Sequence, residues 1–301
     1  MLGSIVKNDP FFLLRKEFHM LGAIYGDIVG SRFEFTGFKS KNFDLFTEKC
    51  MFTDDSLMTL AIAKTLLFYR LDDIEFLKKM AILNMVEIFK EYPNVNWGST
   101  FYEWLTGFKT PTNSCGNGAA MRTSPVGWIS NNIEEVKIYS KALTEISHNN
   151  PEAIKGAEAI AMAIYLARTG CTKSEIRDYI GNNYYKELFN LDFKWLQQNY
   201  GDIDKSDPDG FDVNYVMCQG SVPQAILAFL ESSDFEDAIR NAISLGGDSD
   251  TLACMCGSIA EAYYGMTVYQ ELDVISKLPI NLSSIYYAFE TVKKQRNICF
   301  F

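Results

Sequence analysis

Two acidic clusters in this sequence have the residue types of a binding site for a hard divalent cation. The first is Thr53-Asp54-Asp55, and the second, far downstream, is Asp248-Ser249-Asp250-Thr251. Carboxylates and hydroxyls without nearby His or Cys suit Mg²⁺ or Mn²⁺, whereas Zn²⁺ usually takes imidazole or thiolate ligands. Both clusters open stretches of helical periodicity, so the sequence predicts one centre formed where two helices begin.

Each cluster taken alone has a simpler explanation. Thr and Asp commonly cap helix N-termini, where they accept hydrogen bonds from free N–H groups. A cap needs one oxygen, whereas each segment supplies at least three side chains of this kind. Adjacent carboxylates also repel one another unless a cation or hydrogen-bond donors neutralise them. Considered together, the clusters therefore favour a metal site.

A further acid, Glu34, lies between Phe33 and Phe35 in the segment that follows Gly26-Asp27. If Glu34 borders a cleft, this apolar setting would raise its basicity, and it could orient a water molecule or accept its proton. On an open surface it would have no such role. Asp27 is predicted to be a structural hydrogen-bonding residue.

A glycine-bearing loop, residues 114–122, has the sequence Ser-Cys-Gly-Asn-Gly-Ala-Ala-Met-Arg. Glycines permit close approach, so such a loop can present several backbone N–H groups to a phosphate. It is not a Walker loop, because no Gly-Lys-Ser/Thr follows, and a plain turn is the alternative.

His148 lies where one expected helix ends and the next begins. Two roles are open to it: a structural role in capping or packing, and ligand binding.

The elements that must position these residues are helices. Apolar residues recur at intervals of three and four, no strand–helix alternation is visible, and the pattern predicts an all-α fold. The length of 301 residues would allow two domains, but a metal site split between distant segments favours one. Ser221 and Pro223 are expected to start a helix, and small residues after Thr251 indicate a buried central helix. The expected helices span 57–68, 74–89, 133–147, 152–168, 222–231, 235–245 and 251–264, and the longest expected irregular stretches are 36–53, 107–127 and 201–221.

Composition restricts the partners and the compartment. The net charge is −10 with no basic stripe, so nucleic acid is not expected as a partner except as a modified substrate. The 7 cysteines are odd in number and scattered, which indicates a reduced, cytoplasmic protein. No apolar stretch is long enough for a membrane span. Residues 1–19 are predicted to be an N-terminal extension, and residues 20–301 a single domain.

The ordered set of these motifs resembles the ADP-ribosylglycohydrolase family, whose bacterial prototype is dinitrogenase reductase-activating glycohydrolase. The resemblance runs from about residue 21 to residue 265. It implies a single compact orthogonal helical bundle that uses one or two Mg²⁺ or Mn²⁺ ions to remove ADP-ribose from a modified protein or a small ADP-ribosyl compound. ADP-ribosyl-arginine on protein is the expected substrate, since relatives of the prototype favour that linkage.

The resemblance also implies roles for individual residues. The implied metal ligands are Thr53, Asp54, Asp55, Asp248, Asp250 and Thr251. The implied catalytic residues are Glu34, on a loop that gates the site, together with Asp55 and Asp250. The implied substrate contacts are Ser114, Gly116, Asn117, Gly118 and His148, and Phe211 or Tyr215 is a candidate for the adenine site.

Two departures and two alternatives accompany this resemblance. Cys115 stands where relatives often carry an aromatic residue, and Asn149 stands where a second His is common. Neither departure removes an implied metal ligand. The first alternative is a non-catalytic ADP-ribose-binding or crystallin-like structural protein, since a fold does not fix a function. The second is a metal-dependent hydrolase of the diphosphate.

Overall fold

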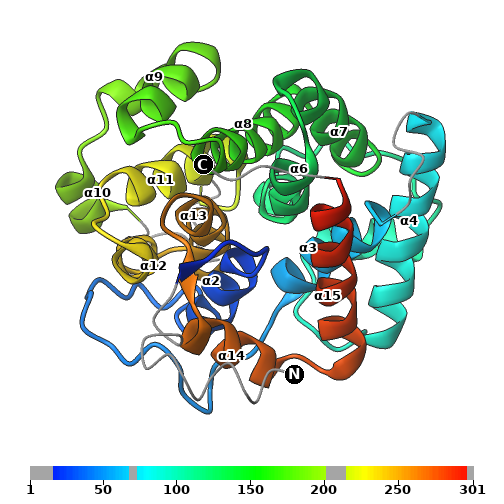
Figure 1. Cartoon of the computed structure of the whole chain (residues 1–301), viewed down its shortest axis with the longest axis horizontal. Coiled ribbons are helices and arrows are strands. Elements are labelled where there is room, and N and C mark those ends of the chain that lie inside the picture. Colours follow the sequence, from blue (N-terminus) through cyan, green and yellow to red (C-terminus); the bar gives the residue numbers. More distant parts are fainter. Residues whose placement is uncertain (1–15, 68–72, 201–214, 297–301) are drawn as a thin grey trace.

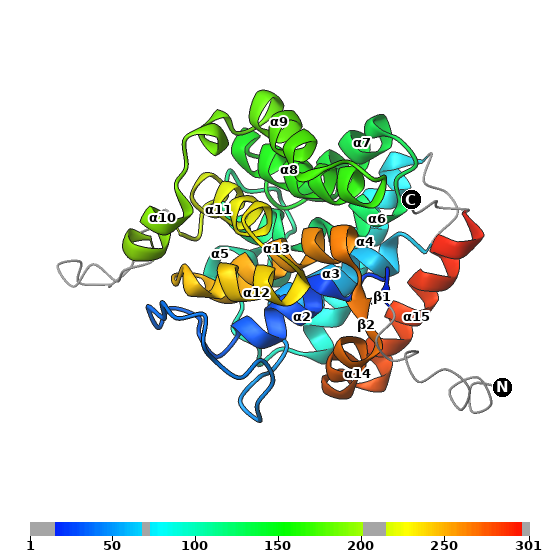
Figure 2. The same ribbon diagram turned by 60° about the vertical axis from the view of Figure 1, so that its left-hand side comes forward.

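Two helices that touch backbone to backbone form the centre of the protein. The computed structural model describes residues 16–67, 73–200 and 215–296. Helices α2 (Gly22–Gly30) and α13 (Ser249–Tyr264) lie together in the middle of the molecule (Figure 1; Figure 2). All of α2 is buried, and α13 is buried along nearly its whole length. The buried central helix expected after Thr251 is therefore confirmed.

Glycines at every fourth position of α2 permit this close approach. A Cβ atom on Gly26 would lie 1.9 Å from the carbonyl oxygen of Ala253. A Cβ atom on Gly30 would lie 2.5 Å from the Cα atom of Asp250. Only glycine fits at such contacts, because the obstructing atoms belong to the backbone. The second contact brings the start of α13 next to the end of α2.

We expect Gly26→Ala to lower the free energy of unfolding by about 3 kcal/mol, because backbone atoms cannot rotate away from the added methyl group. Urea unfolding of the purified variant measures this loss. Gly98→Ala is the matched control, since a Cβ atom there meets nothing within 4 Å. Equal stability of the two variants would contradict the close approach of α2 and α13.

The other helices surround this central pair. Helices α8, α11 and α12 pack against α13, while α3 packs against α2, α4 and α15. In Figure 1, α7, α8 and α9 lie above the central pair, and α4 and α15 lie to its right. The helices are α3 Asp54–Thr65, α4 Ile74–Glu91, α5 Ser99–Thr106, α6 Ser124–Ile129, α7 Ile133–Glu145, α8 Pro151–Arg168, α9 Lys173–Asn183, α10 Phe193–Asn199, α11 Cys218–Leu230, α12 Phe235–Ser244, α14 Val268–Lys277 and α15 Ile280–Gln295. Short 3₁₀ turns are η2 Asn117–Ala119, η3 Met121–Thr123 and η4 Lys186–Phe189, and the two strands are β1 Lys16–Glu17 and β2 Met266–Thr267.

The all-α prediction is confirmed, and each predicted helix is present. Two local predictions are wrong. The stretch 107–127 contains η2, η3 and the start of α6. Pro125 is compatible with α6 because it lies in the first turn, where its missing N–H needs no partner. Helix α11 begins at Cys218 instead of Ser221, so Pro223 lies inside the helix. Of the predicted irregular stretch 201–221, residues 201–214 lie outside the described residues. None of the helices in the described ranges is long and apolar enough to cross a membrane.

The residues just before α2 are bound to the rest of the fold. Strand β1 pairs antiparallel with β2. The Glu261 carboxylate accepts hydrogen bonds from the backbone N–H groups of His19, Leu21 and Gly22, at 3.1, 2.9 and 2.6 Å. It thereby satisfies free donors at the N-terminus of α2, which has no cap of its own. Residues 16–19 belong to the N-terminal extension that was predicted from the sequence. In the structure they are hydrogen-bonded to the domain.

Candidate functional site

The first acidic cluster lies at the N-terminus of α3, and Asp27 of α2 holds it in place. Thr53 is the N-cap residue, and its hydroxyl accepts a hydrogen bond from the backbone N–H of Asp55 at 3.3 Å. The Asp27 carboxylate accepts the Thr53 hydroxyl at 2.6 Å and the Thr53 N–H at 2.9 Å. It also accepts the N–H and the hydroxyl of Ser56. Asp27 thus has the structural role predicted for it.

The second acidic cluster begins α13 directly beside the first. Gly246 and Gly247 have φ angles of 77° and 66°, in the left-handed region that favours glycine, and they turn the chain from α12 into α13. The Thr251 hydroxyl donates a hydrogen bond to Asp55 Oδ2 at 3.2 Å. The N-termini of α3 and α13, far apart in the sequence, therefore meet at one point.

Carboxylates converge at this point in two overlapping groups. Oxygens of Asp27, Asp55 and Asp250 lie within 4.8 Å of one another, and so do oxygens of Glu34, Asp248 and Asp250. Asp250 belongs to both groups. The arrangement can therefore hold one cation between three carboxylates, or two cations that share Asp250. Sequence reasoning did not place Asp27 in this centre, although it follows one of the glycines that bring α2 against α13.

The environment of these carboxylates fits a bound cation. Burial is the main cause that raises the pKa values of Asp27, Asp55, Asp248 and Asp250, and neighbouring carboxylates raise those of Asp55 and Asp250 further. In the ranges that the structure describes, none of them forms an ion pair with Lys, Arg or His. Asp55 Oδ1 is buried without a hydrogen-bond partner there. A buried oxygen of this kind needs either a proton or a neighbouring positive charge, and a divalent cation supplies the second.

Glu34 follows α2 in a turn that is fastened to the start of α13. The Phe35 N–H donates a hydrogen bond to the Gly247 carbonyl oxygen at 2.9 Å. Burial, followed by the negative charges of Asp248 and Asp27, raises the pKa of the half-buried Glu34 carboxyl to about 7. A carboxyl with this pKa can accept a proton near neutral pH, which is the property required of a general base.

The remaining implied metal ligands lie at the edge of the centre. Asp54 is half-buried in the first turn of α3, and its carboxylate belongs to neither group of three. Burial, followed by the charges of Asp27 and Asp248, raises the pKa of Asp54 to about 8. The hydroxyls of Thr53 and Thr251 donate to Asp27 and Asp55, and each retains acceptor capacity, although one lone pair of Thr53 already accepts the Asp55 N–H.

The glycine loop lies against the N-terminus of α11 and reaches the acidic centre through Asn117. Gly116 pairs with Met217 in an antiparallel bridge, and the Asn117 N–H donates to the Val216 carbonyl oxygen at 2.9 Å. The Asn117 side-chain amide donates to Asp248 Oδ2 at 2.7 Å. Asn117, implied as a substrate contact, therefore also orients an implied metal ligand.

The other implied substrate contacts lie around the same loop. Ser114 Oγ accepts the Gly116 N–H at 3.1 Å. A Cβ atom on Gly116 would lie 3.8 Å from His148 Nε2, and one on Gly118 would lie 3.7 Å from it, so the imidazole faces both glycines. Burial, followed by the charge of Arg122, lowers the pKa of His148 to about 3. The imidazole is therefore neutral at physiological pH.

Only one of the two candidates for the adenine site can be placed. Phe211 lies outside the described residues. Tyr215 packs edge-on against Tyr200, with ring centroids 4.9 Å apart, and its carbonyl oxygen accepts the Asn117 amide at 3.4 Å. Tyr215 thus borders the glycine loop.

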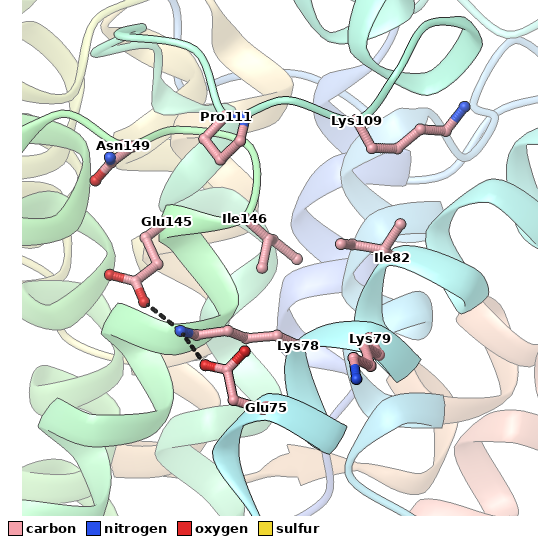
Figure 3. A pocket seen from close by; sticks show the side chains of 9 residues that line it. All are labelled: Glu75, Lys78, Lys79, Ile82, Lys109, Pro111, Glu145, Ile146 and Asn149. Carbon is pink, nitrogen blue, oxygen red and sulfur yellow. Dashed lines mark hydrogen bonds and ion pairs between the residues drawn. The ribbon is translucent and has the colours of Figure 1, made fainter.

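A separate cavity of about 340 Å³ opens between α4, the end of α7 and the chain leading into the glycine loop (Figure 3). Lys78 forms ion pairs with Glu75 at 2.9 Å and Glu145 at 2.8 Å on its wall. Ile82 and Ile146 contribute apolar surface. The lining holds none of the converging carboxylates, so this cavity is distinct from the acidic centre.

Comparison with known sequences decides the family. The sequence model of the ADP-ribosylglycohydrolase family matches residues 19–275, which include Glu34, both acidic clusters, the glycine loop and His148. The chain belongs to the ADP-ribosylglycohydrolase family. Membership of this family supports a glycohydrolase that acts on ADP-ribosyl compounds.

Similar proteins share most of their length with this chain. ADP-ribosylhydrolase ARH3 of Mus musculus is 28% identical over 273 residues, covering 73% of this chain and 71% of that protein. ADP-ribosylhydrolase ARH3 of Homo sapiens is 26% identical over 288 residues, covering 77% of this chain and 78% of that protein. A solved structure described as an ADP-ribosylglycohydrolase-related protein complex superposes with a TM-score of 0.66 at 20% identity, covering 91% of this chain and 96% of that one. The helical bundle expected from the resemblance is therefore confirmed.

Proposed function

We propose that the protein hydrolyses the bond between the anomeric carbon of ADP-ribose and its acceptor, and so releases ADP-ribose. The hydrogen bond from Asn117 to Asp248 carries this proposal, because it joins a buried acidic centre to a glycine loop suited to phosphate. The scissile bond of an ADP-ribosyl compound lies on the ribose that bears the diphosphate. A glycosidic hydrolase therefore needs both features side by side. Family membership supports the same reaction.

The acidic centre is proposed to hold Mg²⁺ or Mn²⁺, as one ion or two. Asp55, Asp248 and Asp250 would be the main ligands, with Asp54 and the hydroxyls of Thr53 and Thr251 completing the set. When bound, such a cation orients ribose hydroxyls and lowers the pKa of water. The partnerless Asp55 Oδ1 and the lack of ion pairs to the centre among the described residues support this assignment.

The side chains around the proposed cation site have different proposed roles. Glu34 is the proposed general base, which orients the attacking water and takes its proton. Asp55 and Asp250, the other proposed catalytic residues, act through their hold on the cation. Backbone N–H groups of the loop from Ser114 to Gly118 bind the diphosphate, as glycine loops commonly do. His148 contacts the same part of the ligand.

The proposed acceptor is an arginine side chain on a protein. Its guanidinium is cationic, and the net charge of −10 together with the carboxyl groups of Glu34 and Asp54 at the edge of the site favours such a group, which can hydrogen-bond to them. Parallel turnover assays on arginine-, serine- and nucleobase-linked ADP-ribose, each with Mg²⁺ and with Mn²⁺, test this choice. We expect release from the arginine-linked compound. Release from another linkage alone would overturn the acceptor and leave the hydrolase proposal standing.

The proposed partners are therefore an ADP-ribosylated protein or a small ADP-ribosyl compound. The proposed compartment is the cytoplasm, where thiols stay reduced. Every cysteine that the structure describes is a free thiol, and these are Cys50, Cys115, Cys171, Cys218, Cys254 and Cys256.

A further inference from the structure

A buried chain of polar groups runs from Arg122 to the imidazole that faces the glycine loop. Arg122 Nη2 donates a hydrogen bond to Ser147 Oγ at 2.6 Å, and Ser147 Oγ lies 2.8 Å from His148 Nδ1. All three side chains are buried. No role for Arg122 or Ser147 was predicted from the sequence, because Ser147 lies far from the loop along the chain.

The distances around Ser147 Oγ favour one direction for the second hydrogen bond. A guanidinium can only donate, so Ser147 Oγ accepts from Arg122. The Ser147 hydroxyl proton then has two acceptors within reach, His148 Nδ1 at 2.8 Å and the Thr144 carbonyl oxygen at 3.5 Å. The 2.8 Å contact has the better hydrogen-bond distance, so the hydroxyl proton makes a stronger bond when it points to Nδ1 than when it points to the Thr144 carbonyl oxygen. Ser147 therefore donates to Nδ1, which places the proton of the neutral imidazole on Nε2.

The backbone beside His148 is held as firmly as the side chain. The Thr112 N–H and hydroxyl both donate to the Ser147 carbonyl oxygen at 2.9 Å. The Asn149 N–H donates to the Thr112 carbonyl oxygen at 2.8 Å. The imidazole therefore has a fixed position, in which Nε2 points to the glycine loop.

Arg122 also places positive charge behind this loop. Its Nε and Nη1 atoms are buried without a hydrogen-bond partner in the described part of the chain, and its guanidinium carbon lies 5.4 Å from the ring centroid of Phe101. Burial lowers the pKa of Arg122 to about 10, so the group remains charged at neutral pH. In a protein of net charge −10, a buried cation at this place favours an anionic ligand in the loop.

We propose that Arg122 and Ser147 are positioning residues that hold His148 as an Nε2–H donor aimed at an oxygen of the ADP-ribose diphosphate. Among the residues that the structure describes, His148 forms hydrogen bonds through Nδ1 and its backbone, which leaves Nε2 available to a ligand. The identity of that ligand rests on the proposed function. The position of the proton rests only on the chain from Arg122 to His148.

Long-range ¹H–¹⁵N spectra of the protein without ligand test the proton position directly. The chain contains only His19 and His148, so two imidazoles are seen, and the His19→Gln variant assigns them. We expect His148 at neutral pH to carry its proton on Nε2, with Nδ1 unprotonated. The opposite tautomer, or a doubly protonated ring, would overturn the proposal, and this spectrum needs no substitution in the chain of polar groups.

Ser147→Ala then tests the consequence for binding. We expect it to abolish the preference for the Nε2–H form and to weaken ADP-ribose binding about tenfold, as for loss of one buried hydrogen bond. Ser130→Ala is the matched control, because this buried hydroxyl donates only to the Val126 carbonyl oxygen, at 2.8 Å. A tautomer and an affinity unchanged by Ser147→Ala would overturn the proposal. Wild-type protein with the Nε2–H form but no affinity for ADP-ribose would contradict the proposed function and leave the tautomer assignment intact.

Discussion

Glu34→Gln is expected to slow release of ADP-ribose by at least about a hundredfold while leaving ADP-ribose binding nearly unchanged. The amide has the shape of the carboxyl but cannot accept a proton from water. The loss of the carboxyl is expected to act on the proton-transfer step, because the loop from Ser114 to Gly118, and not Glu34, is the proposed binding site of the diphosphate. The substitution also removes one negative charge beside Asp248, so the expected loss of rate is not an effect of added repulsion.

Single-turnover rates and ADP-ribose titrations of the same preparation separate the two effects. Glu48→Gln is the matched control, since it makes the same chemical change at an exposed position of the loop before α3. We expect the control to behave as the wild type. A Glu34→Gln variant that turns over at the wild-type rate would remove Glu34 from the mechanism.

Removal of the cation is expected to abolish turnover. Asp250→Asn is expected to weaken metal binding by at least about a hundredfold. This loss exceeds the usual effect of removing a residue that only hydrogen-bonds to a metal ligand. Asp250 is the one carboxylate shared by both acidic groups, so its charge contributes to any ion bound there. Without metal, the same substitution relieves repulsion among buried carboxylates. We therefore expect metal-free Asp250→Asn to be at least as thermally stable as the metal-free wild type.

Both effects are measured by thermal unfolding and by turnover. Each is recorded after treatment with a chelator and again after addition of Mg²⁺ or Mn²⁺. Metal should raise the unfolding temperature of the wild type more than that of Asp250→Asn, because only a bound ion adds its binding energy to the folded state. Asp178→Asn, at an exposed position of α9, is the control. Full activity of the wild type in chelator would contradict the metal proposal.

The sequence was sufficient to predict the helices that begin at the two acidic clusters. Their apolar residues recur at helical spacing, and Thr53 and Asp248 precede the first turns as expected of cap positions. The clusters meet because the N-termini of both helices lie at one centre, which follows from the packing of α13 on α2 and not from the caps. The small residues that follow Thr251 likewise indicated that α13 is buried.

Helix α2 could not be predicted by the same means. Glycine at every fourth position weakens a helix in isolation, and all its residues are buried, so no polar face marks its period. Those glycines are required by contact with α13, a contact that exists only in the folded chain. The place of Asp27 beside Asp250 follows from this packing and was missed for the same reason.

The chain of polar groups behind His148 was also beyond sequence reasoning. Arg122 and Ser147 lie on segments joined only by tertiary packing, and neither position has a local pattern that assigns a partner. What the sequence supplied was the glycine loop and His148 as separate candidates. The structure adds that Nε2 faces the two glycines of that loop.

Product analysis tests the central claim most directly. The wild-type protein is incubated with arginine-linked ADP-ribose and Mg²⁺ or Mn²⁺, and the nucleotide products are separated and identified. Hydrolysis at the anomeric carbon predicts intact ADP-ribose and the free acceptor as products. AMP as the product would place cleavage at the diphosphate, and it would contradict the assignment of the acidic centre and Glu34 to the glycosidic bond.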